Sequence, residues 1–202
     1  ILEGDGMRLR ASFDDMKRRL LRGKLNGELL VRAARLKGIE EPTLVDATAG
    51  LGQDSLLLAA TGFSVTLIEC NPVIAAMLVD AIERARRDPE LADAAGRMRV
   101  IEGDSLKALR DLSMPPDVVY LDPMFPGRSK SAAVKKKFQL LHRLEMPCED
   151  EMALLEAARA AHPRKIVIKR PVKGPHLAGV KPDYTLRGKA VRYDCIVMAR
   201  ES

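Results

Sequence analysis

The stretch from Leu44 to Asp54 constrains the fold most, because it has the order of a strand, a glycine turn and a helix start. Two apolar residues lead into Asp46, and Gly50 and Gly52 follow it before an apolar, helix-forming run begins. Glycines let the backbone turn sharply and let a ligand approach it closely, while the free N–H groups of the helix start face the same place. The stretch therefore predicts a βα unit with a ligand site at its turn.

The residues around the glycines indicate which ligand this turn binds. A dinucleotide site needs a third glycine in the pattern G-x-G-x-x-G, but Ser55 stands at that position. Asp46 and Asp54 place acidic groups around the turn, which repel a pyrophosphate and suit an ammonium or sulfonium group. The pattern Asp-x-x-x-Gly-x-Gly resembles motif I of class I, Rossmann-like methyltransferases, which implies S-adenosylmethionine. Taken alone, the motif also fits an ordinary βα turn with capping residues.

Three further apolar segments end next to acidic residues, as the first one does, and they cover residues 64–68, 98–101 and 117–121. Strands that alternate with helices predict a parallel sheet with right-handed crossovers, whose ligands bind beyond the carboxyl ends of the strands. Glu69, about 20 positions after the glycine turn, is predicted to accept hydrogen bonds from ribose hydroxyls rather than simply to face water. Asp104 and Ser105 are predicted to meet the adenine amino group, to cap the next helix, or both.

The catalytic candidate follows the fourth of these strands, in the sequence Asp122-Pro123-Met124-Phe125. It resembles the (Asn/Asp/Ser)-Pro-Pro-(Tyr/Phe) motif of amino-group methyltransferases, with Met124 in place of the second proline. An exocyclic amine on a base is a weak nucleophile, because its lone pair is delocalised into the ring. The Asp122 carboxylate and a backbone carbonyl near Pro123 are predicted to hold both amine hydrogens and to aim the lone pair at the methyl carbon. Phe125 is predicted to stack on the extruded base, and a proline-rich loop with a buried Phe is the alternative.

A basic segment directly follows this motif. A small-metabolite enzyme has no need of cations there, whereas contacts to phosphates position a nucleic acid. Further cations end the fifth predicted strand, over 165–169, near the same face of the sheet. A basic helix predicted over 14–22 also suits a polyanion, although such helices are more often solvated faces. The residues predicted to bind RNA are Arg128, Lys130, Lys135, Lys136, Lys137, Lys169 and Arg170.

The composition narrows the class of protein further. The net charge of +6 and the pI of about 9.3 suit a polyanionic partner. The three cysteines are scattered without a Cys-x-x-Cys pair, which argues against a disulfide framework or a zinc site and favours a reducing compartment. No apolar run is long enough to span a bilayer, and no signal peptide is visible. We therefore expect a cytoplasmic protein that binds neither a membrane nor a metal.

Together these motifs resemble the RsmJ family of bacterial methyltransferases, which modify the N2 amine of a guanine in 16S ribosomal RNA with S-adenosylmethionine. The resemblance runs from about Phe13 to near the C-terminus and rests on residues 46–54, 69–72, 118–126 and 130–136. It implies an α/β, Rossmann-like class I fold with a mostly parallel seven-stranded sheet, helices on both faces and an antiparallel C-terminal hairpin. It implies cofactor contacts from Asp46, Gly50, Gly52, Gln53, Asp54, Glu69, Cys70, Asp104, Ser105 and Asp122.

The chain departs from that family at three positions and at its start. Gln53 and Cys70 stand where Arg is common in the family, and Asp104 replaces a Ser. The N-terminal region of the family is largely missing before Ile1, and because the chain begins with Ile1 rather than Met, the sequence leaves open whether residues precede it. We predict a shortened appendage of strands and helices over residues 1–40 and a methyltransferase domain over residues 41–202.

Two other functions are compatible with these residues. The methyl group could be transferred to another amine, on DNA adenine or on a protein side chain. A non-catalytic RNA-binding or assembly protein could keep the fold, although the set of Asp46, Gly50, Gly52 and Glu69 argues against it. The missing third glycine disfavours a NAD-dependent oxidoreductase. The prediction is thus a methyltransferase enzyme whose partner is 16S rRNA or the small ribosomal subunit.

Overall fold

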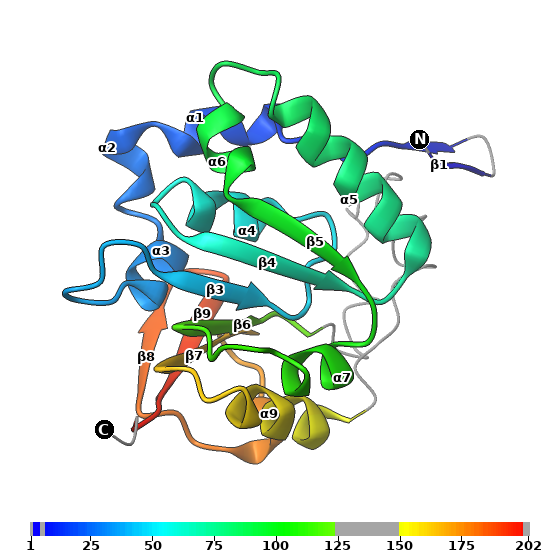
Figure 1. The fold of residues 1–202 in the computed structure, drawn as a ribbon. Helices are drawn as coiled ribbons and strands as arrows, with labels where there is room; N and C mark the ends of the chain where they lie inside the picture. Colours follow the sequence, from blue (N-terminus) through cyan, green and yellow to red (C-terminus); the bar gives the residue numbers. More distant parts are fainter. Residues whose placement is uncertain (1, 5–6, 124–149, 200–202) are drawn as a thin grey trace.

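The computed structural model describes residues 2–4, 7–123 and 150–199, and it centres on one seven-stranded sheet. The spatial order is β5–β4–β3–β6–β7–β9–β8 (Figure 1). Neighbouring strands from β5 to β7 are parallel, and β9 runs antiparallel to both β7 and β8. The strands are β3 (Thr43–Asp46), β4 (Ser64–Glu69), β5 (Met98–Glu102), β6 (Val118–Leu121), β7 (Lys165–Pro171), β8 (Tyr184–Arg187) and β9 (Val191–Val197). The predicted sheet and its C-terminal hairpin are confirmed.

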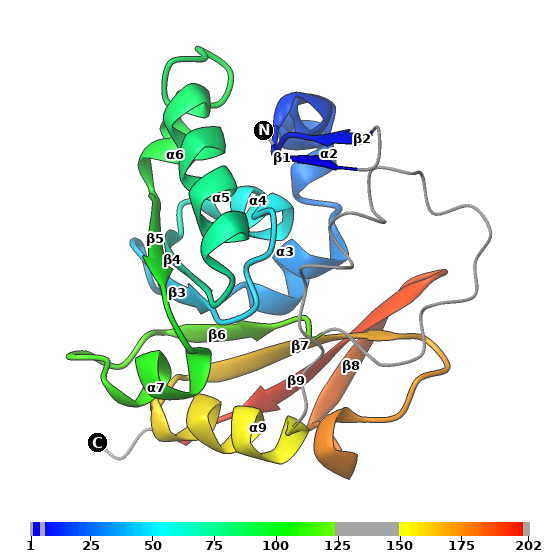
Figure 2. The ribbon, with the colours of Figure 1, turned by 90° about the vertical axis from the view of Figure 1, so that its right-hand side faces the viewer.

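Helices cover both faces of the sheet (Figure 2), as predicted. One face carries α3 (Leu29–Ala34), α4 (Gln53–Ala59), α5 (Pro72–Ala85) and α6 (Ala92–Gly96). The other face carries α7 (Ser105–Arg110), α9 (Glu151–Ala160) and the 3-10 turn η2 (Leu177–Gly179). No helix in the described ranges is long and apolar enough to cross a membrane.

Two hydrophobic cores lie on the two sides of the sheet, because successive strand residues point to opposite faces. On β3, Leu44 packs in the core beneath α4 and α5, whereas Val45 packs in the core beneath α7 and α9. A local signal in the sequence sets where α5 begins. The side chain of Asn71 accepts hydrogen bonds from the N–H groups of Val73 and Ile74 and so caps the start of α5.

The N-terminal residues form a short hairpin followed by broken helical turns. β1 (Leu2–Gly4) pairs antiparallel with β2 (Met7–Leu9), and η1 (Asp14–Met16), α1 (Lys17–Leu20) and α2 (Arg22–Leu25) follow. The single helix predicted over 14–22 is wrong, because Leu21 is extended, with φ −55° and ψ 130°. Met16 and Leu25 are both buried in the same core. In a continuous helix, two residues nine positions apart lie about 180° apart around the axis. The break at Leu21 therefore allows both Met16 and Leu25 to face the core.

The segment before β3 shares its core with the sheet. Phe13 and Leu30 are buried in the same hydrophobic cluster as Leu44 of β3 and Leu56 of α4. The residues from α3 also contact β7, β8 and β9. This part of the predicted appendage therefore packs as one body with the sheet.

Candidate active site

The carboxyl ends of four neighbouring strands form the edge where the predicted site residues gather. β3 pairs in parallel with β4 and β6, and β6 pairs in parallel with β7. Their following loops therefore meet at one edge of the sheet, where ligands of such folds bind. Asp46, Glu69 and Asp122 all lie at this edge.

Asp46 is buried and organises the glycine turn from inside. It is 2% exposed. The Ser55 hydroxyl donates to its Oδ2 at 2.5 Å, and the Thr48 N–H donates to its Oδ1 at 3.0 Å. Burial disfavours the carboxylate and raises the pKa of Asp46 to about 7, against the opposing effect of these hydrogen bonds. Ser55, which occupies the position of the missing third glycine, thus ties the start of α4 to the end of β3.

The two glycines of the turn have different surroundings. Both have positive φ, 52° at Gly50 and 72° at Gly52. A Cβ atom on Gly52 would lie 2.6 Å from Cδ1 of Leu78, whereas a Cβ atom on Gly50 would have nothing within 4 Å. Gly52 is therefore required by packing against α5, while Gly50 leaves the turn open to a ligand. Gln53, the first residue of α4, is exposed beside them.

Glu69 connects the glycine turn to the start of α5. It is 8% exposed. Its Oε2 accepts from the Gly50 N–H at 2.9 Å, and its Oε1 accepts from the Asn71 N–H at 2.8 Å. The neighbouring Cys70 is exposed, and both partial burial and the charge of Glu69 raise the pKa of its thiol. The carboxylate thus lies at the turn, at the end of β4, where the sequence predicted it.

Asp104 and Ser105 lie at the end of β5 and the start of α7. Asp104 is exposed, and its Oδ1 accepts from the Leu106 N–H at 3.0 Å, which is the capping role that the sequence allowed. The Ser105 hydroxyl donates to the backbone oxygen of Ala47 at 2.5 Å. This hydrogen bond links the residues that follow β5 directly to the loop that follows β3.

Asp54 and Asp122 are joined by a single cation, Lys169. Its Nζ lies 2.6 Å from Oδ2 of Asp54 and 2.8 Å from Oδ2 of Asp122. The Tyr120 hydroxyl donates to the same Oδ2 of Asp54 at 2.7 Å. Burial disfavours the Lys169 ammonium, but the two carboxylates outweigh it and raise its pKa above the ordinary value. Burial also raises the pKa of Tyr120, so its hydroxyl stays a neutral donor.

Strand register explains why these groups meet. β6 and β7 pair Leu121 with Ile168, so the next residues on the two strands, Asp122 and Lys169, are neighbours. Tyr120 lies two positions before Asp122 and therefore on the same face of the sheet, the face covered by α4. Asp54 lies in the first turn of α4 and closes the cluster.

Asp122 is held by its backbone as well as by its side chain. Its N–H donates to the Thr48 hydroxyl at 2.7 Å, which connects it to the glycine turn. Pro123 follows it and is buried. Oδ2 is occupied by Lys169, and Oδ1 accepts no hydrogen bond from the part of the chain that the structure describes. Within the described residues, Lys169 therefore holds one oxygen of the Asp122 carboxylate at this edge of the sheet, and the other oxygen has no hydrogen-bond donor.

The sequence reasoning missed Thr48, Tyr120 and the role of Lys169, and it was wrong about Arg170. Lys169 was predicted to bind RNA, but its side chain is 20% exposed and is held by the two acids. Arg170 was also predicted to bind RNA, but it is fully buried on the opposite face. Its guanidinium donates to the Pro175 carbonyl at 2.8 Å and pairs with a Glu151 oxygen at 3.1 Å. The position of Tyr120, two residues before the acid, was the only available signal for its role.

Several predicted site residues lie outside the described residues. These are the stacking residue and the basic segment, namely Phe125, Arg128, Lys130, Lys135, Lys136 and Lys137. Among the described residues, no group of three His, Cys, Asp or Glu side chains could hold a metal ion.

Comparison with known proteins places this arrangement in a family. The model of a family described as putative SAM-dependent methyltransferases matches residues 6–198. The chain belongs to this family. Ribosomal RNA small subunit methyltransferase J of Pseudomonas aeruginosa strain LESB58 is 48% identical over 170 residues, which cover 84% of this chain and 65% of that protein. The chain therefore spans just under two thirds of the length of this curated relative.

Other relatives support the same assignment. Ribosomal RNA small subunit methyltransferase J of Thioalkalivibrio sulfidiphilus is 47% identical over 182 residues, covering 89% of this chain and 71% of that protein. The crystal structure of a SAM-dependent methyltransferase from Neisseria gonorrhoeae superposes with a TM-score of 0.77 and 36% identity, covering all of this chain and 79% of that one. An rRNA methyltransferase from Streptomyces viridochromogenes, 17% identical with a TM-score of 0.55 over 97% of this chain and 88% of its own, shares the fold.

Proposed function

We propose that this methyltransferase transfers a methyl group from S-adenosylmethionine to the exocyclic N2 amine of a guanine in 16S ribosomal RNA. The observation that carries the proposal is the placement of Asp122. It follows the fourth strand of the sheet in chain order, it is linked by Thr48 to the glycine turn, and one of its oxygens has no donor among the residues that the structure describes. The names of the relatives, which are ribosomal RNA small subunit methyltransferases, supply the class of substrate.

The residues at the edge of the sheet fit the cofactor. The open space beside Gly50 allows a ligand to approach the backbone of the turn. The carboxylate of Glu69 lies at the end of β4, where a ribose is held in folds of this kind. When bound, S-adenosylmethionine supplies an electrophilic methyl group on a positively charged sulfur. The acids Asp54 and Asp122 give the site the negative potential that such a cation requires.

The remaining groups act on the target amine. Oδ1 of Asp122 accepts one amine hydrogen, and a backbone carbonyl near Pro123 accepts the other. These two acceptors orient the nitrogen so that its lone pair faces the methyl carbon, and such positioning contributes several kcal/mol to catalysis. The amine proton that is released on methylation leaves through the same hydrogen bond to Asp122. Phe125 stacks on the extruded base.

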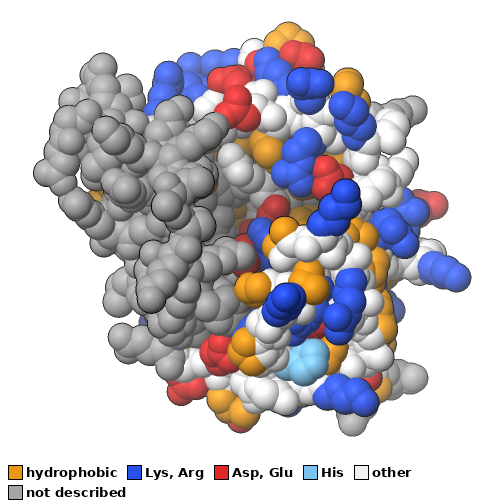
Figure 3. All heavy atoms as spheres, turned by 180° about the vertical axis from the view of Figure 1, so that it is seen from behind, with side chains coloured by type: hydrophobic (Ala, Val, Ile, Leu, Met, Phe, Trp, Pro, Cys, Tyr) orange, Lys and Arg blue, Asp and Glu red, His pale blue; other side chains and the backbone are white. Residues whose placement is uncertain are grey.

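Charge supports a nucleic-acid substrate. The net charge is +6, and Lys and Arg side chains are spread over the described part of the face seen in Figure 3. The cations at positions 128–137, directly after the Asp-Pro-Met-Phe motif, contact phosphates of the RNA. The substrate is 16S rRNA or the small ribosomal subunit, which places the activity in the cytoplasm.

A labelled-methyl assay tests this function. We expect S-adenosylmethionine to label 16S rRNA at a guanine N2 amine, and we expect DNA and peptide substrates to stay unlabelled. Asp122→Ala should lower the rate at least about a hundredfold, the size of a lost positioning group, while binding of S-adenosylhomocysteine weakens only in part. Asp93→Ala is the matched control, because this carboxylate is 88% exposed and pairs only loosely with Arg97 at 3.5 Å.

Each other result points to a different function. Labelling of DNA or peptide in preference to rRNA would show a methyltransferase with another amine as substrate. RNA binding without binding of S-adenosylhomocysteine would indicate a non-catalytic RNA-binding or assembly protein. Full activity in Asp122→Ala would refute the role assigned to that residue.

A further inference from the structure

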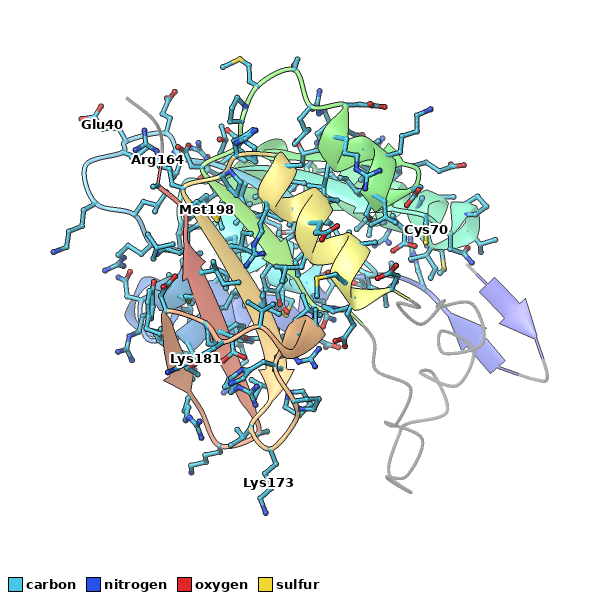
Figure 4. All side chains as sticks on the ribbon, turned by 90° about the horizontal axis from the view of Figure 1, so that it is seen from below. Glu40, Cys70, Arg164, Lys173, Lys181 and Met198 are labelled. Carbon is cyan, nitrogen blue, oxygen red and sulfur yellow. The ribbon has the colours of Figure 1, made fainter. Side chains whose placement is uncertain are left out.

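Lys169 lies within the proposed active site, but the function proposed above gives it no role. A lysine that bound RNA phosphate would extend into solvent, as Lys173 does a few residues later in Figure 4. The Lys169 side chain is instead 20% exposed and lies between two carboxylates that belong to α4 and to the end of β6. It therefore connects the cofactor side of the proposed site, at Asp54, to the target side, at Asp122.

We propose that Lys169 is a positioning residue for methyl transfer: it fixes one oxygen of Asp122 and sets the net charge beside the cofactor. The proposal rests on the function proposed above. Because Nζ occupies Oδ2 of Asp122 at 2.8 Å, the carboxylate cannot rotate freely and presents Oδ1 to the amine. The second bond, to Asp54 at 2.6 Å, fixes the ammonium itself.

The charge balance of the cluster gives the second half of the argument. The two carboxylates and one ammonium together carry a formal charge of −1. This charge favours the positively charged sulfur of the methyl donor over the neutral sulfur of the product, S-adenosylhomocysteine. Removing Lys169 changes the formal charge to −2, and removing Asp54 changes it to 0. Other charged residues around the cluster, such as Asp46 and Arg19, are not substituted in any of these variants.

The first test compares donor and product affinities by calorimetry. In Lys169→Met, the preference for S-adenosylmethionine over S-adenosylhomocysteine should increase on the order of tenfold, as expected for one added negative charge. Lys169→Arg should keep the wild-type ratio within about twofold, because it retains the cation. Asp54→Asn should shift the ratio in the opposite direction, toward the product. Any contact that both ligands share cancels in the ratio.

A second lysine on β7 provides the matched control. Lys165 is buried at the other end of the strand, and its Nζ donates to the carbonyls of Ala33 and Arg35, each at 2.9 Å. Lys165→Met removes a buried ammonium far from the carboxyl edge, so it should lower the melting temperature without changing the affinity ratio. If Lys169→Met does not fold, Asp54→Asn still tests the charge argument. An unchanged ratio in Asp54→Asn, or in a folded Lys169→Met, refutes the proposal.

A kinetic measurement separates positioning from RNA contact. We expect kcat for rRNA methylation to fall at least about tenfold in Lys169→Met, with KM for RNA changed by less than about twofold, and Lys169→Arg to recover part of the rate. A higher KM for RNA in Lys169→Met would instead indicate that this lysine binds a phosphate, if the slope of RNA affinity against salt also fell by about one phosphate contact. That result would overturn the proposal. If the wild-type protein binds neither ligand, the proposed function fails, which is a distinct result.

Discussion

The two glycines of the turn allow a paired test of what each contributes, and we expect Gly52→Ala to be much more destabilising than Gly50→Ala. An alanine with φ near +72° costs about 1–2 kcal/mol in backbone strain. Its Cβ would also lie 2.6 Å from Cδ1 of Leu78, 3.2 Å from Cδ2 of Leu67 and 3.5 Å from Cζ of Phe13. These three side chains are almost fully buried, so they have little room to move.

The magnitude follows from these two costs and one gain. Overpacking in a core costs about 1–3 kcal/mol. Replacing glycine by alanine also restricts the unfolded chain, which stabilises the protein by about 0.4–1 kcal/mol. We therefore expect Gly52→Ala to lower the free energy of unfolding by about 2–4 kcal/mol. Gly50→Ala has the same backbone strain and the same restriction of the unfolded chain, but no overpacking. We therefore expect it to lower the free energy of unfolding by about 1 kcal/mol or less.

Urea denaturation of both variants measures the free energies of unfolding, and titration with S-adenosylhomocysteine measures ligand binding. Gly50→Ala should fold well but bind the ligand at least about tenfold more weakly, because its methyl group occupies the open space beside the turn. Equal free energies of unfolding for the two variants would refute the packing argument for Gly52. Unchanged ligand affinity in a folded Gly50→Ala would refute the assignment of the open space to the cofactor.

Two further predictions concern buried charged groups. The raised pKa of Asp46, about 7, means that the folded state favours its protonated form. Its contribution to stability is therefore complete below about pH 4 and is lost as pH rises to about 7, by up to roughly 4 kcal/mol. Asp46→Asn should remove this slope from urea denaturation measured between pH 4 and 7, and a retained slope would assign it to another group. Arg170→Met should lower the free energy of unfolding by about 3–5 kcal/mol, because it leaves Glu151 without this cation in a partly buried site. RNA affinity should be unchanged in Arg170→Met, and Arg187→Met, at an exposed arginine, serves as the control. A loss of RNA binding in Arg170→Met alone would show that Arg170 contacts RNA after all.

Local patterns predicted most of the strands and helices in the described residues. The alternation of apolar segments with helices, the glycine turn and the Asn-Pro start of α5 each act within a few residues, so they can be recognised without tertiary information. Where this failed, a packing requirement competed with the local pattern. The predicted helix over 14–22 breaks at Leu21 because Met16 and Leu25 both pack into one core.

The sequence by itself determined which acids lie at the carboxyl edge of the sheet, because each directly follows an apolar strand. It did not determine their partners, because Asp54 and Lys169 are 115 positions apart and meet only through the strand order and register. Lys169 and Arg170 show the limit most clearly. They are adjacent cations at the end of the same strand, and sequence reasoning gave them one role. The pleat of β7 sends Lys169 to the acids beside α4 and Arg170 to Glu151 on α9, so the tertiary structure alone separates them.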